Sequence, residues 1–438
     1  MVNLSITEKM EIVLSVGQIL AENGATANKI INNVKRVAVS MQIPKENFNL
    51  KVMPEVLFLN VSCGEKSHLA FRNYEKHGVD MNIVNLINTL TIKAVKKNYP
   101  PQKFNDILNR IVSRNKLYSN TQIIFATGLF CGAFCFLFGG DLLASFYTAI
   151  AAIMGKFFQL KSIKYGVNHF CAIAIASFVA TSLAYFAHFL PTETMWTPFV
   201  ACSLFLIPGI PIMNAITESL DGFLLNGMTK AYHSTLIAIS IMVGIVLAAN
   251  IWEHLEEIDL GKVSLLVDHS FVELLFLGII VSISFSTFIN APKKILLLLG
   301  SLGVIALIIK DLIIYHLVLS TEMATFISSL IIGILAIIAK KYTYAPTLLL
   351  TVPPIISFVP GVLIFRALSS FIYIRYLNAE QFFYEMGFAI DALQIIVAMT
   401  VGVTLPYLLA NKFLKKNHRF IRPFKKAGYF YKLRRFAK

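Results

Sequence analysis

The stretch "FLIPGIPIMNAITES", Phe205–Ser219, lies inside an apolar segment long enough to cross a membrane, yet it contains residues that interrupt a helix. Proline removes a backbone donor and clashes with the preceding turn, and glycine lets the backbone leave helical angles. In lipid, a break is tolerated only where protein or a water-filled cavity satisfies the freed backbone groups. The stretch therefore predicts a broken helix beside a binding site, with the break at Pro208, Gly209 and Pro211.

The composition is that of an integral membrane protein. The chain has 438 residues, of which 56% are hydrophobic and only 14% charged. Its start, "MVNLSITEKMEIVL", carries acidic residues within a short apolar region and lacks a small-residue cleavage site. We therefore expect no signal peptide and a cytosolic N-terminus.

The hydropathy pattern predicts an α-helical polytopic protein with about ten spans, preceded by a small cytosolic α+β domain. The expected divisions are the cytosolic domain 1–120, a first five-span repeat 121–252, an acidic external loop 253–269, a second five-span repeat 270–411 and a basic cytosolic tail 412–438. The expected spans are Thr121–Phe138, Leu142–Phe158, Asn168–Leu190, Trp196–Leu220, Lys230–Trp252, Ser270–Ile289, Ile295–Ile314, Thr321–Ala339, Ala345–Leu368 and Gly387–Asn411.

The basic residues of the connecting loops predict the orientation. With ten spans and a cytosolic N-terminus, most loop lysines face the cytosol, as the positive-inside rule requires. The outer loops would then hold only Lys262, Lys310, Arg366 and Arg375. The sequence therefore predicts a multi-pass protein of the cytoplasmic or inner membrane with both termini in the cytosol.

The two halves share a motif. "IPGIPIMNAI" from Ile207 aligns without gaps with "VPGVLIFRAL" from Val359, an offset of 152 residues. Each half has an odd number of spans, so the second half enters the membrane upside down. This pattern predicts an inverted repeat with a broken fourth helix in each half, as in secondary transporters.

A half-helix that starts near the first break would point free N–H groups at an anion, while freed carbonyls could accept from an ammonium group. An amino acid has one group of each kind. The substrate-binding candidates are Pro208, Gly209, Pro211, Asn214, Glu218, Pro360, Gly361 and Arg366. Alternatively, the prolines only kink packed helices, and Arg366 extends outward to the membrane surface.

Acidic residues inside spans are candidates for proton coupling, because burial can bring a carboxyl into a titrating range. The candidates are Glu218, Asp221, Glu273 and Asp391. The alternative is that these residues lie at the membrane boundary in contact with water.

The sequence predicts neither a cofactor nor a metal site. The cysteines lack metal-ligand spacing, and the sequence around Gly261–Lys262 is not a phosphate-binding loop, so direct drive by ATP is not expected. The tail interleaves eleven Lys/Arg residues with aromatic residues, a composition that suits anionic lipid headgroups better than nucleic acid at this location. Assembly with further copies of the chain is left open.

These motifs resemble the threonine/serine exporter family, in which ten spans follow a cytosolic N-terminal domain. The resemblance covers nearly the whole chain: the opening "LSVGQILAENGATANKI", the "FGGD" turn and both Pro-Gly segments. Its most specific part is Pro208-Gly209-Ile210-Pro211 followed by Asn214, Glu218 and Gly222. The departures are Glu218, where the family more often has Asp, and Pro354 and Ser357 before the second break.

The resemblance implies a secondary exporter of threonine- or serine-like amino acids, coupled to protons, and not an enzyme. Relatives with the two halves on separate chains are associated with dicarboxylate export, so a succinate-like cargo is the alternative. A further alternative makes the N-terminal domain a membrane-anchored enzyme or signalling module. The expected partners are a small amino acid or organic acid, protons and anionic lipids.

Overall fold

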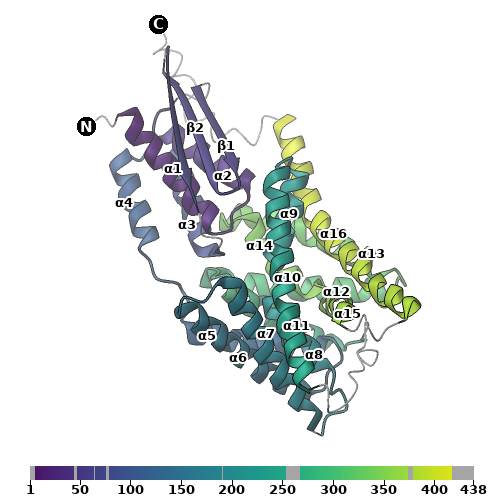
Figure 1. Ribbon diagram of the computed structural model, residues 1–438. Coiled ribbons are helices and arrows are strands. Elements are labelled where there is room, and N and C mark those ends of the chain that lie inside the picture. The colour runs from purple at the N-terminus through teal and green to yellow at the C-terminus, as the bar shows by residue number, and fades with distance from the viewer. Residues whose placement is uncertain are drawn as a thin grey trace.

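The computed structural model describes residues 5–43, 47–63, 65–74, 78–189, 191–252, 267–372 and 378–416, and most of these residues are helical (Figure 1). Most of the expected external loop and of the basic tail lies outside the described residues, as do Lys262 and Arg375.

Residues 5–112, here called the N-terminal unit, combine four helices with an antiparallel sheet of strand order β1-β2-β3. The elements are α1 (Ile6–Glu22), α2 (Ala27–Ser40), β1 (Phe48–Met53), β2 (Val56–Cys63), β3 (Lys66–Asn73), α3 (Met81–Lys97) and α4 (Pro101–Val112). The sequence "FNLKVMPEVLFLNV" predicts one strand, but a tight turn divides it into β1 and β2, with Glu55 at φ 67°. Leu57 and Leu59 of β2 are fully buried, whereas Phe71 of β3 is exposed, so the helices cover one face of the sheet.

The remaining helices form a bundle. They are α5 (Asn120–Leu137), α6 (Leu142–Lys164), α7 (His169–Tyr185), α8 (Thr197–Ala201), α9 (Gly209–Leu220), α10 (Leu224–Trp252), α11 (Phe271–Phe288), α12 (Leu296–Tyr315), α13 (Thr321–Thr343), α14 (Thr347–Ile355), α15 (Gly361–Ile372) and α16 (Ala379–Lys416). Short 3₁₀ turns connect these helices. The turn Phe186–Phe189 follows α7, Leu204–Leu206 follows α8, Lys293–Ile295 precedes α12, and Ile356–Phe358 follows α14.

Within the described residues, seven helices are long and apolar enough to cross a membrane, or nine if each of two bent helix pairs counts as one span. Helix α7, with 17 residues, is a shorter apolar helix. The architecture is therefore that of a polytopic membrane protein. Two helices begin earlier than expected: α10 at Leu224 rather than Lys230, and α16 at Ala379 rather than Gly387. Their first turns carry polar residues, which hydropathy alone assigns to loops.

Helix pairs recur in the two halves of the bundle. Helix α5 packs on α6 and α7 on α10 in the first half, and α11 packs on α12 and α13 on α16 in the second. Glycines allow close approach within the pairs α7–α10 and α13–α16. Gly244 of α10 lies against Ser177 of α7, and Gly402 of α16 lies against Ser329 of α13. Ser177 and Ser329 are 152 positions apart, the offset of the sequence repeat.

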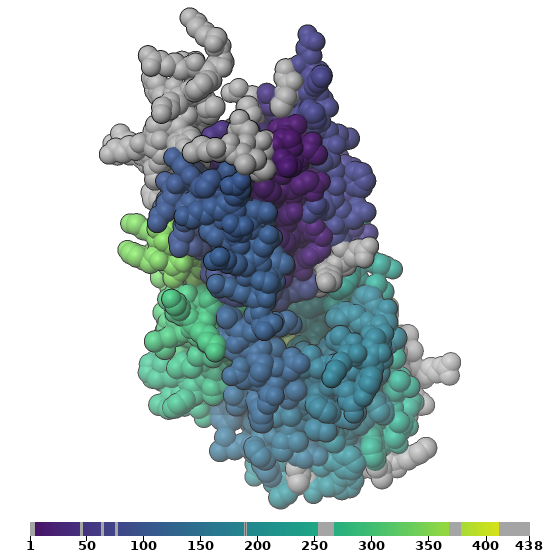
Figure 2. Space-filling view, turned by 90° about the vertical axis from the view of Figure 1, so that its left-hand side faces the viewer, coloured from purple at the N-terminus to yellow at the C-terminus, as the bar shows by residue number. Residues whose placement is uncertain are grey.

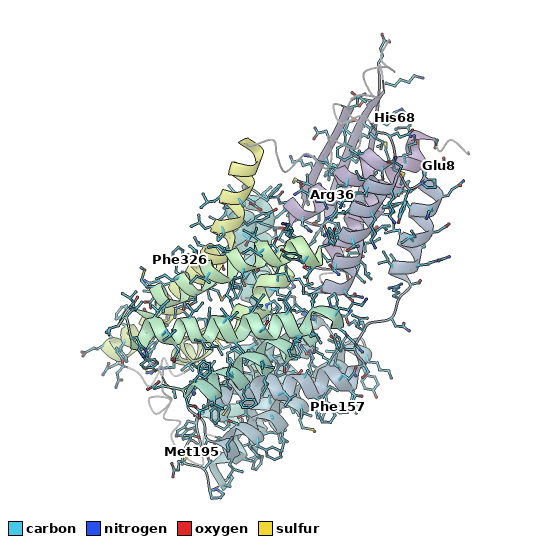
Figure 3. All side chains as sticks on the ribbon, turned by 180° about the vertical axis from the view of Figure 1, so that it is seen from behind. Glu8, Arg36, His68, Phe157, Met195 and Phe326 are labelled. Carbon is cyan, nitrogen blue, oxygen red and sulfur yellow. The ribbon has the colours of Figure 1, made fainter. Side chains whose placement is uncertain are left out.

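The N-terminal unit covers one end of the bundle, here called the near end (Figure 2). The Met81 N–H donates to Ile289 O at 2.8 Å, and the Asn88 side-chain amide donates to Tyr344 O at 2.8 Å. Arg36 lies closer to the bundle than Glu8 and His68, and Met195 lies at the opposite, far end (Figure 3). These contacts fix which ends of the bundle helices face the N-terminal unit.

Substitution of Gly402 by Ala should destabilise the bundle. A Cβ at this position would lie 2.7 Å from both Phe326 O and Ser329 Cβ, so α16 must move away from α13. Such overpacking costs about 1–3 kcal/mol. Thermal unfolding of the purified protein would measure the loss.

Gly387 of the same helix provides the matched control, because a Cβ there would meet no atom within 4 Å. Gly387→Ala should be neutral or stabilising by up to about 1 kcal/mol, through the better helix propensity of alanine. Equal unfolding temperatures for the two variants would contradict the described packing of α13 on α16.

Candidate functional site

At each Pro-Gly segment one helical segment ends and another begins in a different direction. The chain bends by 60° between residues 197–206 and α9, and by 64° between residues 347–358 and α15. Helix α9 begins at Gly209, so Pro211 occupies its first turn, where a missing N–H leaves no intrahelical bond unmade. The predicted breaks are therefore present, and they take the form of a 3₁₀ turn followed by a new helix.

The two breaks use the same hydrogen bonds. Gly209 N–H donates to Ile207 O at 2.8 Å, and Gly361 N–H donates to Val359 O at 2.8 Å. One turn later the N–H groups of Ile212 and Ile364 donate at 3.0 Å to the carbonyls of Pro208 and Pro360, respectively. Each donor and acceptor of the first break lies 152 positions before its counterpart.

The breaks also contact each other reciprocally. A Cβ on Gly209 would lie 3.1 Å from Ile356 Cδ1, and a Cβ on Gly361 would collide with Leu204. Leu204 and Ile356 are again 152 positions apart, so one contact is the counterpart of the other. Each glycine thus leaves room for an apolar side chain from the other break.

The space at the crossing of the breaks is closed by apolar side chains. The cavity there has only about 20 Å³, and its lining is apolar: Phe130, Phe134, Leu204, Phe205, Ile207, Gly209, Phe285, Phe288, Ile356 and Val359. Ring contacts connect the two halves, with Phe130 centred 5.9 Å from Phe285 and 5.2 Å from Phe288. In this conformation the crossing separates the two ends of the bundle and holds no solute.

A larger cavity of about 260 Å³ lies between the second break and the far end. Pro360 and Gly361 line it together with Asp391, so the structure brings three of the predicted residues to one cavity. Four further ionisable residues line it that the sequence analysis did not select: His269, Lys310, Asp311 and Glu322. Lys310 and Asp311 lie inside α12, not in a loop, and charged residues within an apolar helix are the signal that could have found them.

Glu218, in contrast, binds the N-terminal unit. Its side chain is 1% exposed, and Oε1 accepts from Ala27 N–H at 2.7 Å and from Lys230 Nζ at 2.8 Å. Ala27 is the first residue of α2, so the carboxylate lies at the positive end of that helix. Among the described residues, Glu218 Oε2 has no hydrogen-bond partner.

The neighbours of Glu218 on α9 make parallel contacts. Asn214 donates through Nδ2 to Gly24 O at 3.3 Å, and Asp221 Oδ2 accepts from Asn28 Nδ2 at 3.1 Å. The loop "ENGATAN" between α1 and α2 is therefore the contact surface of α9. The structure places Asn214, Glu218 and Asp221 away from the crossing and against the N-terminal unit.

Arg366 and Glu273 have local partners. The Arg366 guanidinium forms a two-point ion pair with Glu385 of α16, at 2.7 and 3.2 Å, and stacks over the Phe388 ring at 4.0 Å. Glu273 accepts from the Ser270 N–H at 2.8 Å and caps the start of α11. Neither side chain lines the cavities described above.

Within the described part of the chain, no group of three or more His, Cys, Asp or Glu side chains could hold a metal ion. The cavity of about 260 Å³, here called the far cavity, offers one lysine, carboxylates and hydroxyls, which suit a small charged solute.

The family follows from comparison with known proteins. Residues 11–252 match the family described as "Putative threonine/serine exporter", and residues 274–409 match "Threonine/Serine exporter, ThrE". The chain belongs to the threonine/serine exporter family. Both breaks fall inside the matched regions of this family. No solved structure matches the chain.

Two curated relatives carry the description "Probable succinate transporter subunit YjjP". The one from Klebsiella aerogenes is 26% identical over 188 residues, which are 41% of this chain and 70% of the relative. The one from Escherichia coli (strain K12) is 24% identical over 189 residues, with the same coverage. The description of the family names threonine and serine, whereas the descriptions of these two relatives name succinate.

Substitution of Glu218 by Gln should loosen the docking of the N-terminal unit, because the amide loses the charge that attracts Lys230 and the start of α2. A hydrogen bond to a charged group contributes about 1.5–3 kcal/mol. Amide hydrogen exchange across the α1–α2 loop should then be at least about tenfold faster, since each 1.4 kcal/mol is a factor of ten.

The control for this measurement is Glu193→Gln, which changes an exposed carboxylate elsewhere in the bundle. It should leave exchange in the α1–α2 loop unchanged. Unchanged exchange in Glu218→Gln as well would show that the carboxylate does not hold the N-terminal unit in place.

Proposed function

We propose that this protein is a secondary active transporter that exports small amino acids of the threonine or serine kind and is coupled to protons. The observation that carries the proposal is the reciprocal contact of two equivalent helix breaks beside a cavity of about 260 Å³ that holds both signs of charge. Broken helices at equivalent positions are the usual frame of a transporter binding site. The family of the chain supports the same class of function.

In this proposal the two halves form an inverted repeat of five spans each. The 3₁₀ turn Phe186–Phe189 lengthens α7, so α7 and the two bent pairs complete ten spans. The matched hydrogen bonds of the breaks and the matched glycine contacts of α10 and α16 support the repeat. The N-terminal unit then lies in the cytosol as a separate domain and the far cavity opens outward, with the protein in the cytoplasmic or inner membrane.

The far cavity suits a zwitterion. Lys310 presents an ammonium group that forms no ion pair with a described residue and lies 5.0 Å from the centre of the Phe358 ring. Asp311 and Asp391 present carboxylates to the same space. A solute carboxylate would therefore meet Lys310, and a solute ammonium would meet the aspartates. The Ser357 hydroxyl, which has no hydrogen-bond partner among described residues, also lies in the cavity wall.

Export requires that the crossing of the breaks open, since its apolar side chains close the route in this conformation. The bends at the breaks and the short helix α8 provide the points at which α9 and α15 can rotate. The solute would then enter from the near end of the bundle before it reaches the crossing.

A dicarboxylate of the succinate kind is the second candidate, favoured by the names of the two relatives. Threonine and succinate have the same number of non-hydrogen atoms, so charge and not size would decide between them. The three acidic residues of the far cavity, Asp311, Glu322 and Asp391, favour the ammonium-bearing solute. Counterflow in proteoliposomes, with labelled threonine or labelled succinate against an excess of either unlabelled solute, separates the candidates.

Threonine counterflow that serine inhibits and succinate does not would support the amino-acid assignment. Counterflow of succinate alone would overturn that assignment and leave the transporter class in place. If neither threonine nor succinate shows counterflow, both proposed solutes are wrong.

Asp391 is the residue of the far cavity that we expect to carry the coupling proton. Asp391→Asn cannot take up or release a proton, so a pH gradient should no longer accelerate net export. Counterflow at equal pH on both sides should continue at a weaker apparent affinity, because it needs no net proton movement and Asp311 still faces the solute ammonium. Flux would be measured with and without an imposed gradient.

Glu380→Gln, an exposed change on the same helix, is the matched control and should keep the gradient dependence of the parent protein. If Asp391→Asn also keeps it, the proton passes through another group.

A further inference from the structure

A third cavity, of about 90 Å³, lies where the N-terminal unit meets the near end of the bundle. Its wall combines α2 with the end of α13, the start of α14 and the end of α16. It has room for several water molecules, at about 10–15 Å³ each, and therefore for one small ion or solute. The cavity is separate from the crossing of the breaks and from the far cavity.

Cations gather at this cavity. Lys29 of α2 and Lys340 of α13 line it, and both side chains are partly buried. Arg36, seven residues further along α2, is a second positive charge near Lys29. Burial, together with repulsion from Lys340 and Arg36, lowers the pKa of Lys29 well below its usual value. Like charges in such a place repel one another and are poorly hydrated.

The described residues supply little compensation for these charges. Lys29, Arg36 and Lys340 form no ion pair with a described carboxylate. Lys340 Nζ donates to Thr347 Oγ1 at 3.1 Å, and Arg36 donates to Asn88 Oδ1 at 3.1 Å, so their partners are neutral. Asp221 is the one carboxylate in the cavity wall, and it accepts from Asn28. Lys29 and Lys340 in the wall, with Arg36 as a neighbour of both outside it, thus face one carboxylate, so positive charge is in excess around the cavity.

Hydroxyls and backbone donors complete the wall. Thr26, the residue before α2, makes no capping bond to its helix with its side chain, and Thr217 and Thr351 lie across the cavity. The start of α2 also adds the positive end of a helix dipole. The lining thus offers donors and positive charge around a small cavity, which is the chemistry of an anion site.

We propose that this cavity binds a small dianion, with Lys29 and Lys340 as its direct partners, and that the bound anion ties the N-terminal unit to the bundle. Lys29 belongs to the N-terminal unit and Lys340 to the bundle, so the anion bridges the two parts as a further contact beside that of Glu218. The occupant carries two negative charges on oxygen atoms, as inorganic phosphate and a small dicarboxylate both do. The inference goes beyond the proposed transport, since the binding requires no movement of solute across the membrane.

The test uses the full-length protein purified in detergent, with inorganic phosphate, succinate, acetate and threonine as probes. Isothermal titration calorimetry measures binding, and thermal unfolding measures the stabilisation that a ligand of the folded state must produce. We expect phosphate, succinate or both to bind one site and raise the unfolding temperature. Which of the two binds identifies the source of the dianion, and either result supports the site.

Lys29→Gln and Lys340→Gln should each weaken dianion binding at least about tenfold, the effect of losing one charge-assisted hydrogen bond. The matched controls are Lys35→Gln on α2 and Lys341→Gln on α13, whose side chains are exposed. These controls should bind as the parent protein does. Without ligand, Lys29→Gln should unfold at the same or a higher temperature than the parent, because the substitution removes repulsion among buried cations.

The inference is overturned if neither dianion binds, if acetate binds as tightly as the dianions, or if Lys29→Gln and Lys340→Gln bind like their controls. A lower unfolding temperature of ligand-free Lys29→Gln would also contradict it, since that result would make Lys29 a structural partner of another group. Transport of threonine or succinate is measured separately, so failure of the transport proposal and failure of this one are distinguishable.

Discussion

A helix that is interrupted inside an apolar bundle must find new partners for its backbone groups, and this constraint shapes the centre of the molecule. Each Pro-Gly segment meets it with a short 3₁₀ turn and a tight bond from the glycine N–H to the carbonyl two residues before it. Because glycine has no side chain, space remains beside each of the two glycines, and an apolar side chain from the opposite break fills it. The two breaks therefore stabilise each other, and the rest of the bundle is arranged around their crossing.

Local sequence signals were sufficient for the helices and the breaks. Long apolar stretches, capping residues and the Pro-Gly pairs act within a few residues of their positions, so their consequences can be read from the chain itself. The errors lie where local signals are weak. The polar first turns of α10 and α16 look like loops by hydropathy, and the turn at Glu55 lies within a stretch of strand-forming residues.

The sites depended on contacts between distant parts of the chain, which one sequence does not reveal. Glu218 and Ala27 are 191 positions apart, and nothing in "NAITES" indicates that a helix start would lie against the carboxylate. Glu385, which pairs with Arg366, lies 19 positions further along on the following helix, and no local pattern links the two. Lys310 and Asp311 were detectable, because a charged pair inside "LIIKDLII" is unfavourable in lipid without a cavity or partner.

The position of Glu218 has a consequence for how the protein can be regulated. The N-terminal unit is attached to the bundle at two kinds of place. Asn214, Glu218 and Asp221, on or directly after α9, contact the α1–α2 loop, whereas Met81 and Asn88 donate to Ile289 and Tyr344, directly after α11 and α13. A rotation of α9 relative to α11 and α13 would therefore move the α1–α2 loop against the rest of the N-terminal unit or break its contact with α9. A ligand that holds this loop in place would resist that rotation.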